Sequence, residues 1–370
     1  MDVNHYHFSR KEITTMKKID FAVSHQKSVF HNPFQNNELV TQPLEVRSDP
    51  LTGHQSVYNS GLEGKAQILY PDTDYDYMAQ RAEETVATCF LCPDDWRQKT
   101  PNYPKEFIPE GILEHGQAAL FPNLFPVAAY HTVIRLGSRH FRKLDELPPD
   151  LLQDGFTVAL DFVRRSFEFD PTMCYPTLNI NYMLPAGASL MHPHMQILNS
   201  PTPSGHHQLL IEKSRQYTQQ NKSSYWTDLV AEEKTLGQRY IGQTGDAFWI
   251  AAFSPTGYNE IQAVWPKKQN FLQFAEKDIA DLSKGLSHIL KTMHTMKLSS
   301  FNFACFCAPL NEPTTDEPEM ACFMRIVNRQ NVLPNHRTDD YFLQKLLKNE
   351  LILNTPEKLA QWMKKDFPGE

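Results

Sequence analysis

Two parts of the chain show the same order of hydrophobic patterns: strands, one amphipathic helix, then strands again. In the first part, residues 147–167 carry apolar side chains at helical spacing and prolines at their start, which predicts a helix. Short alternating runs at 111–120, 132–136 and 177–183 predict strands around it.

The second part repeats this order after a polar stretch at 212–236. A helix is predicted at 279–296, and strands are predicted at 247–253, 260–264, 301–308 and 322–327. The repeated order predicts an α+β fold built of two related units, although no repeat is visible in the sequence itself.

These patterns divide the chain into four predicted parts. They are an N-terminal arm at 1–45 with a short helix near 10–19, a first unit at 46–200, a second unit at 201–345, and a helical tail at 346–370. The Pro/Ser/His-rich stretch NSPTPSGHH at 199–207 is the predicted linker between the units.

Composition narrows the class of protein. The 370 residues are 41% hydrophobic and 21% charged with a net charge of −7, and no block rich in Lys or Arg predicts a nucleic-acid partner. No apolar run reaches the roughly 18–20 residues of a membrane span, and the polar N-terminus does not resemble a signal peptide. We therefore expect a cytoplasmic protein, in which closely spaced pairs among the six cysteines indicate metal binding rather than disulfides.

The stretch MHPHMQIL at 191–198 is the strongest chemical signal. In a strand, alternate side chains share a face, so His192, His194 and Gln196 are predicted to project together while Met195 and Ile197 point into a core. The proline between the histidines fits a strand edge beside a cleft. The simpler alternative is two ordinary histidines on a half-exposed strand.

A second signal is Cys89-Phe-Leu-Cys92. Two thiolates at this spacing can bind one tetrahedral Zn²⁺, with two further ligands from elsewhere in the chain. His131, His140 and His192 are the candidates for these ligands. A redox pair and chance spacing remain alternatives.

Together these motifs resemble the galactose-1-phosphate uridylyltransferases of the histidine-triad superfamily, whose nucleotidyl-transferring members carry H-x-H-x-Q. Arg47-Ser-Asp-Pro-Leu-Thr-Gly53 is similar to their N-terminal R-x-[ND]-P-L-T-G, and VIRLGSRHFRKLDELP at 133–148 is similar to the segment that holds their third zinc ligand. The resemblance implies two histidine-triad-like domains, each an antiparallel sheet with helices packed on it, and a homodimer.

The resemblance also implies roles for individual residues. The implied ligands of a structural zinc ion are Cys89, Cys92, His140 and His192. His194 is the implied nucleophile, and the implied phosphate contacts are Asn181, Gly187, Ser189 and Gln196.

These residues suit transfer of a nucleoside monophosphate between phosphorylated compounds. A neutral imidazole is a good nucleophile near pH 7, and a covalent nucleotidyl-histidine divides one difficult exchange into two easier steps. The expected partners are a nucleotide or nucleotide sugar and a phosphorylated acceptor. A phosphorylase of dinucleoside polyphosphates or nucleotide sugars is the first alternative, and a catalytically silent, zinc-containing nucleotide-binding protein is the second.

The second half departs from the family. The histidine-bearing segments of a second metal site correspond here to CFCAPLN at 305–311 and CFMRIVNRQ at 322–330, and its glutamate falls near Leu210. We therefore expect no second metal site of that kind. The nucleobase and the acceptor are left open.

Overall fold

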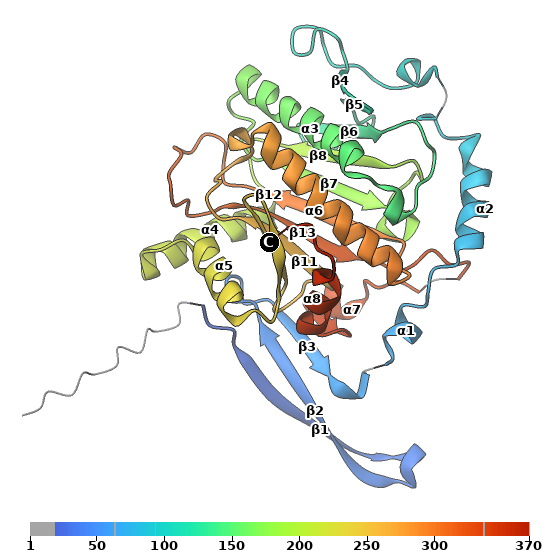
Figure 1. Cartoon of the computed structure of the whole chain (residues 1–370), viewed down its shortest axis with the longest axis vertical. Coiled ribbons are helices and arrows are strands. Elements are labelled where there is room, and N and C mark those ends of the chain that lie inside the picture. The colour runs from blue at the N-terminus through green and yellow to red at the C-terminus, as the bar shows by residue number, and fades with distance from the viewer. Residues whose placement is uncertain (1–18, 63, 93, 336, 370) are drawn as a thin grey trace, which may run out of the picture.

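The computed structural model describes residues 19–62, 64–92, 94–335 and 337–369. Its centre is a ten-stranded antiparallel sheet (Figure 1). In spatial order the strands are β4 (Leu113–His115), β5 (Ala118–Pro122), β6 (Tyr130–Leu136), β8 (His194–Asn199), β7 (Thr177–Tyr182), β12 (Phe301–Phe306), β13 (Cys322–Asn328), β11 (Tyr258–Trp265), β10 (Ala247–Ala251) and β9 (Tyr240–Thr244).

The sheet consists of two halves with the same topology. Each half has a three-stranded meander, then a long helix, then a pair of strands, and β7 pairs with β12 to join the halves edge to edge. The predicted α+β class and the repeated order are confirmed. The predicted domain limits, 46–200 and 201–345, stay a prediction.

One face of the sheet is covered by α3 (Pro149–Phe169) and α6 (Glu276–Thr295), which lie side by side (Figure 1). Their apolar stripes bury the main core, which includes the β8 residues Met195 and Ile197. Gly155 of α3 allows this close packing, since a Cβ there would lie 2.6 Å from the Leu136 side chain. The helices therefore hold β8 in a fixed position.

The opposite face of the second half is covered by α4 (Gly205–Asn221) and α5 (Tyr225–Leu236), which form most of the stretch predicted only as polar. Leu210, together with Phe306 and Phe323 from the segments 305–311 and 322–330 that were compared above with a second metal site, packs in one apolar cluster on this face. The predicted linker connects β8 to α4, and His207 within it is buried.

A smaller four-stranded sheet has the order β1 (Val23–Asn32), β2 (Glu38–Ser48), β3 (Gln55–Asn59), β14 (Asn349–Ile352). The β1–β2 hairpin projects from the body (Figure 1), where the sequence predicted only a polar arm. The helix predicted near 10–19 lies, apart from Ile19, outside the described residues.

The remaining helices are short. They are α1 (Ala66–Leu69), α2 (Tyr75–Val86), α7 (Phe342–Lys345), α8 (Pro356–Lys364) and the 3₁₀ turns Pro33–Gln35, Ser60–Leu62, Trp96–Gln98, Leu144–Glu146, Leu184–Ala186 and Phe271–Gln273. In the part of the chain that the structure describes, no helix has the length and apolar character needed to cross a bilayer.

Candidate active site and metal centre

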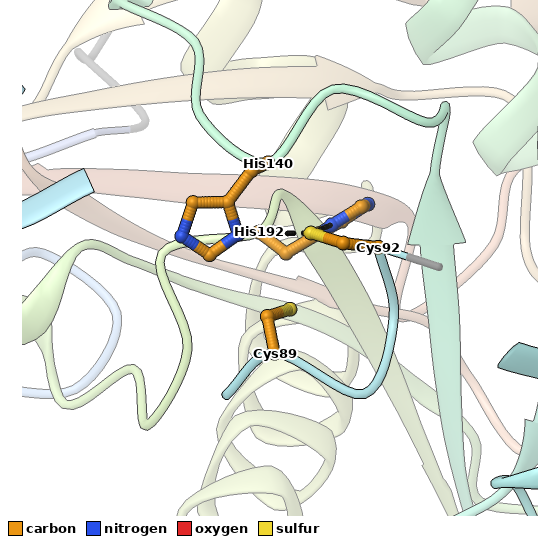
Figure 2. Close-up of side chains that lie close together, drawn as sticks. All are labelled: Cys89, Cys92, His140 and His192. Carbon is orange, nitrogen blue, oxygen red and sulfur yellow. Dashed lines mark hydrogen bonds between the residues drawn. The ribbon is translucent and has the colours of Figure 1, made fainter. Parts of the chain in front are cut away.

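Four side chains that are distant in sequence converge at one end of β8 (Figure 2). Cys89 and Cys92 follow α2, His140 follows β6, and His192 precedes β8. One sulfur or nitrogen atom from each of the four lies within 4.8 Å of all the others. The structure thus brings together the four residues that the family resemblance implied as metal ligands.

Hydrogen bonds fix the orientation of both imidazoles in this cluster. His192 Nε2 donates to the carbonyl oxygen of Gly137 at 3.0 Å. His140 Nε2 lies 2.9 Å from the hydroxyl oxygen of Thr85, which itself donates to a helix carbonyl and can therefore accept a hydrogen bond from the ring. In both rings Nδ1 is left facing the Cys92 sulfur, at 3.3 and 3.0 Å. Outer partners of this kind orient metal-ligating histidines.

The protonation of the cluster also fits a divalent cation. Burial lowers the pKa of His192 to about 4 and lowers that of His140, so both rings are neutral and can act as ligands near pH 7. Burial and the adjacent Cys89 thiol raise the pKa of Cys92 to about 12, and a cation bound by both sulfurs would oppose this rise. Two sulfur and two nitrogen donors form a closed tetrahedral set.

His194 and Gln196 lie on β8 with their side chains on one face, while Met195 and Ile197 are buried on the other. The strand is interior to the sheet, paired with β6 and β7, which corrects the prediction of a strand edge. Because Pro193 directly precedes the strand, its missing N–H costs no ladder bond, and its carbonyl accepts from Leu136 N–H.

Within the part of the chain that the structure describes, the His194 ring has one nitrogen engaged in a hydrogen bond and one without a partner. Its Nδ1 lies 2.8 Å from the carbonyl oxygen of His192, to which only an N–H can donate. That bond places the proton on Nδ1 and leaves Nε2 with its lone pair. Burial lowers the pKa of His194, and its exposed fraction is 6%. The ring is therefore a neutral, preoriented imidazole.

Gln196 is oriented by His131, a residue that the sequence reading considered only as a zinc ligand. The backbone N–H of Val127 donates to His131 Nδ1 at 3.3 Å, so His131 Nε2 carries the proton and donates to Gln196 Oε1 at 2.7 Å. Asn123 Nδ2 lies 3.2 Å from His131 Nε2, but both nitrogens are donors in this tautomer, so no hydrogen bond forms between them. The amide NH₂ of Gln196 is left to donate elsewhere.

The predicted phosphate-binding residues lie around the turn before the motif. Asn181 is the penultimate residue of β7, and continuing the β7–β8 register places it opposite His194. Gly187 has φ +90°, a conformation that favours glycine, and a Cβ there would lie 3.8 Å from Asn181 Nδ2. Ser189 is exposed in the same loop.

The sequence reading missed Asn302 and Arg135. Asn302, on β12, donates to Asn181 Oδ1 at 2.7 Å and to the Ala186 carbonyl at 2.9 Å, so the second half supports the loop of the first. Arg135 is paired with His194 across β6 and β8, and its Nε donates to the Leu91 carbonyl at 2.7 Å. An arginine within the otherwise apolar strand predicted at 132–136 is the feature of the sequence that could have identified Arg135.

Arg47 begins the segment that resembles the family's N-terminal motif, which predicts either a structural ion pair or an active-site role for it. Its guanidinium donates to Glu45 at 2.6 Å and to Glu357 at 2.8 Å, and it is nearly buried. This geometry favours a structural ion pair between the N-terminal sheet and α8.

A cavity of about 340 Å³ adjoins this face of the sheet. Among its lining residues are Asn179, which is paired with Gln196 across β7 and β8, and Leu198, two positions after Gln196 on the same face. The cavity therefore adjoins the neighbours of Gln196 on this face, while Gln196 and His194 themselves are not among its lining residues in the described chain.

Comparison with known proteins places this geometry in context. No family model matches the chain. An uncharacterized protein of Archaeoglobus fulgidus is 31% identical over 266 residues, which are 72% of this chain and 76% of that protein.

Solved structures share the fold at low identity. A GalT-like protein from Arabidopsis thaliana has a TM-score of 0.65 and 16% identity, and covers 87% of this chain and 98% of its own. An ADP-glucose phosphorylase from the same plant, with bound ADP-glucose, has a TM-score of 0.66 and 16% identity, and covers 87% of this chain and 99% of its own. A uridylyltransferase has a TM-score of 0.61 and 17% identity over 87% and 98%.

The predicted resemblance is therefore confirmed at the level of fold. The chain belongs to the same family as the Archaeoglobus fulgidus protein, and it has the fold of the GalT-like proteins and uridylyltransferases.

Proposed function

We propose that the protein is a nucleotidyltransferase that uses Nε2 of His194 as its nucleophile. The observation that carries this proposal is the pair of hydrogen bonds that fixes Nδ1 of His194 and Oε1 of Gln196. Among the described residues, these bonds leave His194 Nε2 and the Gln196 NH₂ without a partner. A binding protein would need neither arrangement.

In the first step, Nε2 attacks the α-phosphorus of a nucleoside diphosphate compound. A nitrogen–phosphorus bond forms, the bond to the leaving phosphate oxygen breaks, and the leaving group departs as a phosphate. In the second step, a phosphate oxygen of the acceptor attacks the same phosphorus and the nitrogen–phosphorus bond breaks. Gln196 NH₂ donates to a non-bridging oxygen in both steps, and Asn181 and Ser189 add donors.

The metal in this proposal is structural zinc, held by Cys89, Cys92, His140 and His192. A closed four-ligand site has no open position for a reacting water, so the ion supplies rigidity only. His192, fixed in this way, directs its carbonyl at His194 Nδ1.

A nucleotide sugar is the favoured donor, since one protein of this fold binds ADP-glucose. That protein is a phosphorylase, so phosphorolysis with inorganic phosphate as acceptor is the second candidate. Both reactions begin with the same covalent intermediate, and only the acceptor separates them. A homodimer stays a prediction.

The test is incubation with UDP-glucose or ADP-glucose labelled at the α-phosphorus. Acid-labile label is expected on the wild-type chain and on His25→Ala, a control at an exposed histidine of β1. His194→Ala is expected to carry none. Equal labelling of His194→Ala would refute the proposal. The acceptor is then assigned by adding inorganic phosphate or a sugar phosphate to the labelled wild-type chain and measuring which of the two removes the label.

A further inference from the structure

A second cavity, of about 590 Å³, lies over the other half of the sheet. It is lined by the loop at 52–55, the start of α4, the segment before β14 and the side chain of Arg325 from β13. None of its lining residues within the described chain is acidic, and three besides Arg325 carry basic side chains, namely His54, His206 and Lys348.

Arg325 is the unexplained residue in this cavity. Its side chain is only 11% exposed, yet within the described residues none of its guanidinium nitrogens makes a hydrogen bond, and Nε is buried without an acceptor. The nearest carboxylate oxygen, Glu260 Oε1, is 3.5 Å from Nε, too long for a good hydrogen bond. Buried donors without acceptors are costly in a folded protein and point to a missing partner.

Glu260 supplies a countercharge to Arg325 through this long approach, but its two oxygens take their short hydrogen bonds from other donors. Gln262 Nε2 donates to Oε1 at 2.8 Å, and the Thr256 hydroxyl donates to Oε2 at 2.8 Å. His206 likewise makes no hydrogen bond within the described residues, and it is an exposed residue that lines the cavity.

This cavity adjoins the one described above, since His206 lines both, and the strand register separates Arg325 from the proposed reaction site. Gln196 is paired with Asn179, Asn179 with Ala304, and Ala304 with Arg325. Three strand spacings separate Gln196 from Arg325, which is roughly 14 Å. A phosphorus atom held by Arg325 is therefore too far from His194 to be attacked.

We propose that this cavity is a second anion site that binds an organic phosphate monoester, with phosphate oxygens accepting from the Arg325 guanidinium. The planar fork of arginine matches two phosphate oxygens, and the neighbouring Lys348 suits a dianion. The volume exceeds what a phosphate group fills, which leaves room for the organic part. The inference rests on the cavity and does not depend on nucleotidyl transfer.

The experiment is calorimetric titration of the full-length, zinc-loaded chain with inorganic phosphate, glucose 6-phosphate and neutral glucose. We expect glucose 6-phosphate to bind more tightly than inorganic phosphate, and glucose not to bind. Arg325→Met should weaken the binding of glucose 6-phosphate roughly tenfold or more, because charge-assisted bonds are lost. Arg215→Met, a matched change at a half-exposed arginine outside the cavity, should leave it unchanged.

A second variant keeps the proposal testable even where Arg325→Met does not fold. Leu209→Glu adds a carboxylate at a half-exposed position of the cavity wall and should also weaken binding. Gln196→Ala and His194→Ala should bind normally. The proposal is overturned if the wild type binds no phosphate, if inorganic phosphate binds as tightly as glucose 6-phosphate, or if Gln196→Ala weakens binding while Arg325→Met and Leu209→Glu do not.

Discussion

At the scale of single residues, the reactive atoms are set by hydrogen bonds to their neighbours. The His192 carbonyl fixes His194 Nδ1, and His131 Nε2 fixes Gln196 Oε1. His131 also accepts from the backbone of Val127, in a loop that lines the adjoining cavity. We therefore assign His131 a positioning role that links the cavity wall to the Gln196 amide.

This role can be tested with His131→Phe, which keeps a ring but removes both hydrogen bonds. Gln196 is then free to rotate its amide, so we expect kcat for nucleotidyl transfer to fall by about tenfold or more with a smaller change in KM. His131→Gln, which restores a donor, should recover part of the rate. A variant that lowers the melting temperature but leaves kcat unchanged would contradict the positioning role.

The sequence predicted His194 and Gln196 on one face because alternation within a strand is local information. It could not predict the contact between His131 and Gln196, which are 65 positions apart. Only the antiparallel register of β6 and β8, in which Val133 is paired with Gln196, brings the two side chains together. That register depends on tertiary packing.

At the scale of elements, the metal cluster joins three segments: the turn after α2, the loop after β6 and the start of β8. A bond network of this kind would add to the apolar packing of the segment after α2, where Leu91 and Trp96 are buried. The CxxC spacing predicted two of the ligands, whereas the choice of His140 over His131 came from the family resemblance.

A zinc ion bound by these four residues would stabilise the fold, so its loss should lower the melting temperature. We expect about one zinc per wild-type chain by elemental analysis, and Cys92→Ala should lose it and melt several degrees lower. A strong chelator should lower the wild-type melting temperature to that of the variant. Cys174→Ala, a change at a buried cysteine outside the cluster, should keep its metal. Full stability of the metal-free wild type would contradict a stabilising role for the zinc site.

Strand β14 carries a second testable feature, the buried Glu350. Burial, followed by repulsion from Asp339 and Asp340, raises its pKa from 4.5 to about 7. Between these values the folded chain keeps a proton that the unfolded chain has released, so the free energy of unfolding falls as pH rises through this window.

Glu350→Gln should remove that dependence. Relative to wild type, the variant should gain stability above about pH 7 and lose this advantage below about pH 4.5, measured by urea denaturation at each pH. Glu317→Gln, at an exposed glutamate, is the control. Parallel pH profiles for the wild type and Glu350→Gln would contradict the assignment.

Elements were predicted well where one face is strongly apolar. The helix predicted at 147–167 is α3, and that predicted at 279–296 is α6. The helix α4 was missed because few of its positions, chiefly Leu210 and Ile211, bury apolar side chains. The β1–β2 hairpin was missed because most of both strands is exposed and carries no alternating pattern.

At the scale of the whole molecule, the two halves share one sheet and one site. Pairing β7 with β12 removes an exposed strand edge from each half. It also brings Asn302 of the second half against the loop at 184–189 of the first. Arg329, paired with Asp339, donates to Asn302 Oδ1 at 2.7 Å and fixes its orientation.

The contact of Asn302 with the loop at 184–189 predicts that a substitution in the second half changes substrate binding in the first. Asn302→Ala removes the donors to Asn181 and to the Ala186 carbonyl, so KM for the nucleotide donor should rise severalfold, with a stability loss of about 1–3 kcal/mol. Asn221→Ala, at the exposed end of α4, should change neither. Unchanged kinetics in Asn302→Ala would show that the first half orders its loop alone.

The repeated order of elements was predictable for the whole molecule, but the continuous sheet was not. Nothing in either half specifies which strand edge its partner pairs with, because edge strands carry the same backbone donors and acceptors. The departure from the family at Leu210 was visible in sequence, whereas its packing with Phe306 and Phe323 needed the structure.

The central claim is that His194 Nε2 becomes covalently bound to phosphorus. The most direct measurement is mass spectrometry of peptides from chain quenched during turnover of a nucleotide sugar, under alkaline conditions that preserve phosphoramidates. We predict one nucleoside monophosphate on the peptide that contains residues 191–198, with fragment ions that place it on His194. An adduct on any other residue, or product formation with no adduct at His194, would contradict it.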